Sequence, residues 1–164
     1  MYFWCQKGFV LFDNISYDRI VEAYNECYIK DSRVLIQANL DLLHILKAYD
    51  ELKLSGKLEK SKFIIGVAQS LAEWLLENER DNSMIAIHQL NILQIIKRQR
   101  NFTESEVNLL LQLSQNDSDM VKAGAFLLLD KLDVAQFVIQ QFPEEEKIRF
   151  MDFPIAIFAK GPNC

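Results

Sequence analysis

Apolar residues recur along the chain at helical spacing, and this pattern predicts a series of helices. In residues 32–56 and 61–80, apolar side chains return every three or four positions, so that they share one face of a helix. The same spacing indicates a helix in residues 16–29 and shorter helices after residue 103. Residues 82–101 are apolar almost all the way round, which is typical of a buried helix. The residues expected to be most buried there are Leu90, Ile92, Leu93, Ile95 and Ile96.

Capping residues predict where these helices begin and end. Thr103 and Glu106 have the spacing of a capping box, and Asp133 with Gln136 has a similar start. Gly56 suits the position just after a helix, because glycine adopts a left-handed backbone easily. The predicted N-caps are Ser16, Ser32, Ser61, Thr103, Asp117 or Ser118, and Asp133.

Together these elements predict an all-α fold of about eight antiparallel helices joined by short loops. No proline occurs between residues 1 and 142, which favours long helices. Residues 83–142 read as two successive helical hairpins, and this architecture resembles the helix-pair units of HEAT-like α-solenoids. A globular helical bundle is the alternative.

We expect a single helical domain over residues 1–164, with three parts. Residues 1–15 form an extended aromatic segment with at most one short strand, around "FVLF". Residues 16–142 form the helical core, and residues 143–164 form a capping helix and tail. The chain length suits one domain with a full core.

The C-terminal stretch is expected to begin a helix at Pro143 and to end it before Pro154. Proline suits the first position of a helix, and Glu144–Glu146 would stand at the positive end of its dipole. Phe153 precedes proline and is therefore pushed out of helical geometry. Phe150 and Phe153 should turn inward. The apolar residues expected to cover the end of the domain are Ile148, Phe150, Met151, Phe153, Ile155, Ile157 and Phe158.

Charge is distributed unevenly along the chain, and this bears on the partner. The formal net charge is −5. Residues 1–100 carry 13 basic and 13 acidic side chains, whereas residues 101–164 carry 5 and 10. A general nucleic-acid binder needs a basic surface, so a nucleic-acid partner is not expected. An acidic surface favours a basic protein partner instead.

Cysteine usage and hydropathy indicate a cytoplasmic protein. The three cysteines include no CxxC pair, and an odd count argues against a disulfide framework. The apolar N-terminal stretch is interrupted by Lys7 and Gly8 and is too short to span a bilayer. No membrane association is therefore expected.

Candidate chemistry is sparse. The sequence contains no phosphate-binding glycine loop, nucleophile elbow or HExxH motif, and no cofactor or metal is expected. His44 and His88 are interpreted as structural residues. The candidate binding residues are two charged clusters, Lys97, Arg98 and Arg100 at the end of one helix and Glu144, Glu145 and Glu146 at the start of another. Helix-dipole compensation is the simpler interpretation of both clusters.

These features favour a non-catalytic helical module that binds a protein partner. It would be either a small acidic inhibitor of the immunity type or a helical domain detached from a larger chain. The alternative is a helical enzyme, a ribonuclease or hydrolase that uses His44 or His88. Convergence of the histidines with charged groups in one cleft would favour the enzyme.

Overall fold

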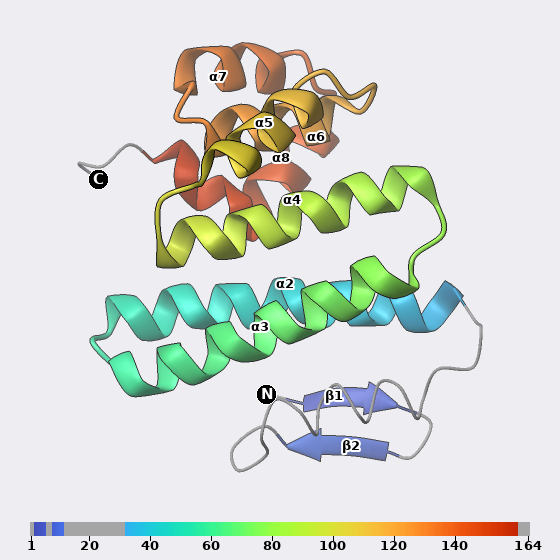
Figure 1. Cartoon of the computed structure of the whole chain (residues 1–164), viewed down its shortest axis with the longest axis vertical. Coiled ribbons are helices and arrows are strands. Elements are labelled where there is room, and N and C mark those ends of the chain that lie inside the picture. The colour runs from blue at the N-terminus through green and yellow to red at the C-terminus, as the bar shows by residue number, and fades with distance from the viewer. Residues whose placement is uncertain (1, 6–7, 12–31, 161–164) are drawn as a thin grey trace. The chain divides into compact units, whose positions relative to one another are not determined.

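The computed structural model describes residues 2–5, 8–11 and 32–160, which hold seven α-helices, one 3-10 helix and two strands (Figure 1). The prediction of an all-α class with antiparallel neighbouring helices is confirmed. The helix expected from Ser16 lies outside the described residues. Contacts divide the chain into two compact units, residues 1–80 and residues 81–164. A single domain over the whole chain stays a prediction.

The N-terminal segment forms a hairpin of two strands, β1 (Tyr2–Cys5) and β2 (Gly8–Leu11). The strands pair antiparallel, with Tyr2 opposite Leu11 and Cys5 opposite Gly8. The expectation of at most one strand is therefore wrong. The two aromatic-rich runs on either side of residues 6–7 satisfy each other's backbone hydrogen bonds, which a lone strand could not do.

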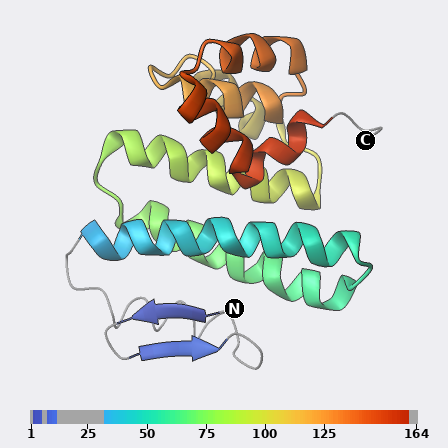
Figure 2. The same cartoon turned by 180° about the vertical axis from the view of Figure 1, so that it is seen from behind.

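The first unit continues with a pair of long antiparallel helices, α2 (Ser32–Leu54) and α3 (Leu58–Asn78), best followed in Figure 2. The turn between them has the hydrogen bonds of a Schellman motif. Gly56 N donates to the carbonyl of Lys53 at 3.1 Å, and Lys57 N donates to that of Leu52 at 2.9 Å. Gly56 has a φ of +74°, so the predicted role of this glycine at the helix end is confirmed.

The facing stripes of α2 and α3 form the core of this pair. Leu42 and Leu46 on α2, and Leu71 and Leu75 on α3, are completely buried, as their spacing predicts. The predicted start of α3 at Ser61 is wrong, because α3 begins at Leu58. Ser61 lies in the first turn, and its hydroxyl donates to the carbonyl of Leu58 at 2.8 Å. A serine near a helix start can thus bond backwards instead of capping.

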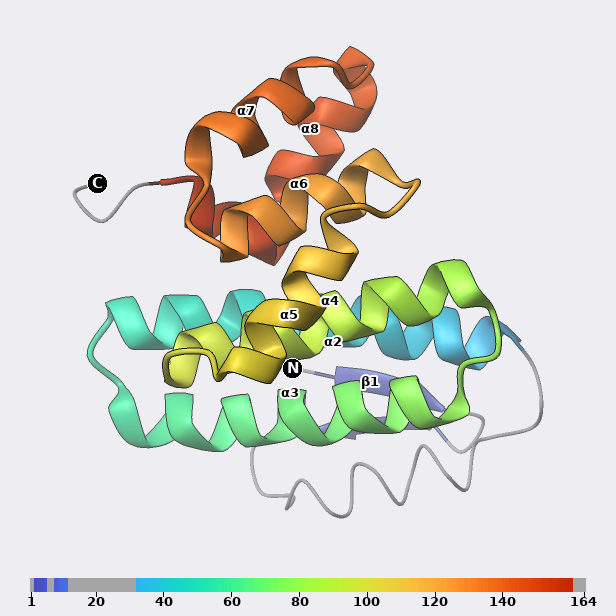
Figure 3. The same cartoon turned by 45° about the horizontal axis from the view of Figure 1, so that its top comes forward.

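The second unit is built around α6. It contacts α4, α5 and α7 and the short 3-10 helix η2, and its place among them can be followed in Figure 3. The bounds of the helices in this unit are α4 Asn82–Gln99, α5 Glu104–Leu113, α6 Asp119–Leu128, α7 Leu132–Gln140, α8 Glu144–Asp152 and η2 Pro154–Ala159.

Close packing of α6 depends on Gly124. A Cβ at this position would lie 2.6 Å from Leu90 Cδ2 and 2.9 Å from Ile155 Cδ1, so the missing side chain lets α4 and η2 approach α6. Leu90 and Leu93 are buried as expected, and so is Ile95. The other two residues expected to be among the most buried, Ile92 and Ile96, are only half-buried.

Among α5, α6 and α7 of the second unit, two helix starts follow the predicted caps and the third does not. Thr103 and Glu106 form the expected capping box of α5, and the Ser118 hydroxyl accepts from Val121 N at the start of α6. For α7, the residue before the helix is Lys131, which makes no side-chain capping bond. Asp133 lies inside the first turn instead, where a carboxylate still interacts favourably with the helix dipole.

The C-terminal elements largely match their prediction. The helix was expected to begin at Pro143, but α8 begins one residue later, at Glu144, and Pro143 is the residue just before it. Phe153 is extended, with φ −73° and ψ 147°, and so ends α8 before Pro154. Phe150 is buried, and its ring meets that of Phe142 edge-on at a centroid distance of 5.5 Å. The 3-10 helix η2 that follows was not predicted.

Candidate functional site

The amino group of Lys97, near the end of α4, stabilises the end of α6. Its Nζ donates to the carbonyl of Leu128 and to Oδ1 of Asp130, both at 2.7 Å. The cation also lies 5.8 Å from the ring centre of Phe102 and 5.6 Å from that of Phe158. A cation at the negative end of a helix dipole is stabilising. Lys97 therefore acts on a different helix from the one expected.

Arg98 is buried and joins α4 to η2. Its Nη1 donates to the carbonyl of Gln94 at 3.0 Å and to Oε1 of the same residue at 3.1 Å. Its Nη2 donates to the carbonyl of Pro154 at 3.0 Å. The guanidinium also stacks on Phe158, with 4.9 Å between its carbon and the ring centre. These contacts make Arg98 an anchor for the C-terminal segment.

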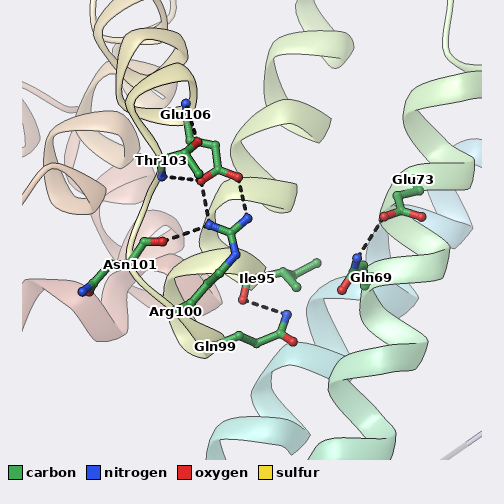
Figure 4. A network of polar contacts seen from close by, with 8 residues as sticks. All are labelled: Gln69, Glu73, Ile95, Gln99, Arg100, Asn101, Thr103 and Glu106. Atoms are coloured by element: carbon green, nitrogen blue, oxygen red, sulfur yellow. Dashed lines mark hydrogen bonds and ion pairs between the residues drawn. The ribbon is translucent and has the colours of Figure 1, made fainter.

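Arg100 holds the link between α4 and α5. Its two terminal nitrogens donate to the two carboxylate oxygens of Glu106 at 2.7 and 2.8 Å, and Nη1 also donates to the carbonyl of Asn101 (Figure 4). Glu106 Oε2 accepts from Thr103 N as well, at 2.7 Å. The hydrogen bond from Arg100, followed by that from Thr103, lowers the pKa of Glu106 from 4.5 to about 2. The same pair raises the pKa of Arg100.

All three residues of the basic cluster, Lys97, Arg98 and Arg100, make contacts within the protein. Lys97 and Arg98 lie in one neighbourhood around Phe158, whereas Arg100 turns to Glu106. Each cation has a backbone carbonyl among its acceptors. These contacts favour a structural role over phosphate binding for all three residues.

The acidic cluster occupies the first turn of α8, as the sequence predicted. Glu144, Glu145 and Glu146 are all exposed. Glu144 forms an ion pair with Lys147 at 3.2 Å. Among the described residues, Glu145 and Glu146 have no ion-pair partner. The position agrees with a dipole effect, and it leaves these carboxylates in solvent.

The outer face of α8 carries two large apolar side chains in solvent. Ile148 is 65% exposed and Met151 is 48% exposed, whereas Phe150 between them is 1% exposed. The expectation that Ile148 and Met151 help to cover the domain is therefore wrong, and Ile157, at 36%, is exposed too. The helical period explains this, because position 148 lies about 200° around the helix from position 150. Applying that period to Phe150 would have revealed the exposed face from the sequence.

A second exposed apolar pair lies on α7. Phe137 is 65% exposed and Val134 is 42% exposed, three positions apart on the side away from buried Ala135 and Ile139. The charged residue of that helix is Asp133. The α7 pair thus matches the α8 pair in exposure but lacks its group of carboxylates.

The two histidines lie in different surroundings. His44, on α2 in the first unit, is exposed, whereas His88, on α4 in the second unit, is completely buried. A buried imidazole cannot contact a substrate while its helix stays folded. Asp41, which is close to His44 in sequence, is largely buried and accepts from Gln37 Nε2 at 3.0 Å.

Among the described residues, neither a metal-binding cluster nor a membrane-spanning helix is present. No group of three or more His, Cys, Asp or Glu side chains among them is placed to hold a metal ion. Within the same ranges, no helix combines the length and apolar character needed to cross a bilayer.

The chain was also compared with known proteins. No family model, no curated protein and no solved structure matches it.

Proposed function

We propose that the protein is a non-catalytic helical interaction module that binds a protein partner through the outer face of α8. This face is defined here as Ile148 and Met151 with the flanking carboxylates Glu144, Glu145 and Asp152. The observation that carries the proposal is the exposure of Ile148 and Met151 on a helix that is held to the core by its buried residue Phe150. Exposed apolar residues rimmed by polar ones are typical of interaction sites.

The charged and titratable residues support the same choice. Lys97 and Arg98, at the end of α4, are engaged in holding α4, α6 and η2 together. His88 is buried, which weighs against the alternative of an enzyme that uses this imidazole. A cytoplasmic inhibitor of the immunity type and a domain detached from a larger chain are both compatible with a binding role.

Firm anchoring of α8 suits such a face. The ring of Phe150 packs against that of Phe142, and its centre lies 6.5 Å from the ring centre of Phe153. The inner side of α8 is therefore held by aromatic contacts. A rigid binding face loses little conformational freedom when the partner docks. The outer side can therefore present Ile148 and Met151 in one defined geometry.

Affinity capture from the native host tests this proposal with the full chain. The bait variants are wild type, Ile148→Gln/Met151→Gln on α8, and Val134→Gln/Phe137→Gln on α7 as the matched control. Glutamine keeps helix propensity and removes the apolar contact. We expect a protein captured by wild type and by the α7 control to be lost with the α8 variant. Equal capture by all three baits would overturn the proposal.

A further inference from the structure

The carboxylates on the outer face of α8 surround its apolar pair. Successive residues turn by about 100°, so Glu144, Ile148 and Met151 lie within about 60° of one another around the helix, and each lies about 100° or more from Phe150. Glu145 and Asp152 lie on one flank of this group, one toward each end of the helix, and the exposed cation Arg149 lies beyond them on the same flank. A partner that covers Ile148 and Met151 would thus meet negative charge at both ends of the contact.

The balance of charge on α8 is negative. The helix contains four carboxylates against two cations, Lys147 and Arg149. Lys147 pairs with Glu144 and is itself half-buried, toward the inner side of the helix. Glu145 keeps its charge without an ion pair among the described residues. With four carboxylates against two cations, α8 therefore presents a net negative charge to whatever docks on its outer face.

The negative charge of this face favours one kind of binding partner over the others. A second copy bound through the same face would set carboxylates against carboxylates, which disfavours a two-fold dimer here. Nucleic acid and anionic lipid surfaces are negatively charged as well. A positively charged protein surface is the complement that remains.

Spacing along α8 points to the form of that surface. Glu144 and Asp152 are eight positions apart, or about 12 Å along the axis. A partner helix with basic residues about two turns apart and apolar residues between them matches this spacing. Its apolar side chains at three- or four-residue intervals would meet Ile148 and Met151.

We propose that the outer face of α8 binds a cationic amphipathic helix of its protein partner. The apolar stripe of that helix packs on Ile148 and Met151. Its Lys or Arg side chains lie beside Glu144 and Glu145 at one end and Asp152 at the other. This inference rests on the proposed function and names the chemistry of the partner.

Synthetic peptides test the partner chemistry on the full-length protein. The probe is a fluorescent 18-residue peptide of leucine and lysine patterned as an amphipathic helix, and its control has glutamate in place of lysine. We expect the lysine peptide alone to bind, with an affinity that falls as salt is raised from about 0.05 to about 0.5 M. Ile148→Gln/Met151→Gln should weaken binding by about tenfold or more, as for removal of central contacts.

Charge-matched variants separate a local effect from the overall acidity of the protein. Glu144→Gln/Glu145→Gln removes two charges from the face, and Glu104→Gln/Asp133→Asn removes two from the first turns of α5 and α7. We expect the first pair to weaken binding by about fivefold or more at low salt, and the second by less than about twofold. Equal effects of both pairs, or equal binding of both peptides, would overturn the inference.

The peptide and capture experiments can fail separately. If the host partner is lost with the Ile148/Met151 variant but the lysine peptide does not discriminate, the binding role stands and the cationic helix is wrong. If the peptide discriminates but host capture does not depend on α8, the proposed function is wrong.

Discussion

The buried guanidinium of Arg98 donates a 3.0 Å hydrogen bond to the backbone carbonyl of Pro154, and this bond joins α4 to η2. The ring of Phe158, in the same 3-10 helix, stacks on the guanidinium. The residue that looked from the sequence like part of a charged cluster thus holds the C-terminal segment in place.

Replacing Arg98 should loosen η2. Arg98→Met keeps much of the side-chain length but leaves the carbonyl of Pro154 without this donor, so we expect a loss of about 1–3 kcal/mol in unfolding free energy. Amide hydrogen exchange in residues 154–159 should become faster. Arg149→Met, at an exposed position on α8, is the control and should change neither measurement. Unchanged exchange in η2 for Arg98→Met would contradict the anchoring role.

Replacing Asp130 by glycine should leave the protein more stable than replacing it by alanine. It ends α6 with a φ of 59°, in the left-handed region that costs an ordinary residue about 1–2 kcal/mol. Both Asp130→Gly and Asp130→Ala remove the ion pair with Lys97, so their difference isolates the backbone term. We expect the glycine variant to be more stable than the alanine variant by about 1 kcal/mol in urea unfolding. Equal stability of the two variants would show that backbone strain is absent.

Neighbouring positions on α8 should respond very differently to truncation. Phe150 is 1% exposed and Met151 is 48% exposed. Phe150→Ala should cost about 3–5 kcal/mol in unfolding free energy because it leaves a cavity. Met151→Ala should cost less than about 0.5 kcal/mol, as is usual at the surface. Similar losses for both variants would mean that α8 presents a different face to solvent.

Glu106 should contribute to stability in a pH-dependent way. Its pKa is about 2 in the folded protein and 4.5 without its partners, so its contribution is complete above pH 4.5 and is lost as the pH falls toward 2. Because Arg100 is half exposed, solvent screening limits the contribution to about 1 kcal/mol or less. Glu106→Gln should therefore be less stable than wild type at pH 7, and the difference should shrink at acid pH. A pH-independent difference would contradict this assignment.

Local chemistry made several elements predictable from the sequence. Thr103 with Glu106 and the left-handed Gly56 act within a few residues of themselves, so their roles could be recognised without knowing the fold. The start of α3 was missed because a serine can cap or bond backwards, and Ser61 does the latter. The pairing of β1 with β2 was likewise missed, because neither strand segment by itself indicates a partner strand.

The hydrogen-bond partners of the basic cluster could not be predicted from the sequence. Lys97 and Arg98 each have a backbone acceptor far along the chain, Leu128 at 31 residues and Pro154 at 56 residues, and only tertiary packing brings them together. The exposed pair Ile148 and Met151 was missed for a different reason. Their apolar character suggested burial, although the helical period turns Ile148 about 160° and Met151 about 100° away from buried Phe150.

Site-specific photo-cross-linking in the native host tests most directly whether α8 is the docking face. A photoreactive amino acid replaces Ile148 in one version of the full chain and Phe137 in another, two positions with the same 65% exposure. We predict a discrete cross-linked product to one protein partner from position 148, and none from position 137. The same products from both positions, or a product from position 137 alone, would contradict binding through the outer face of α8.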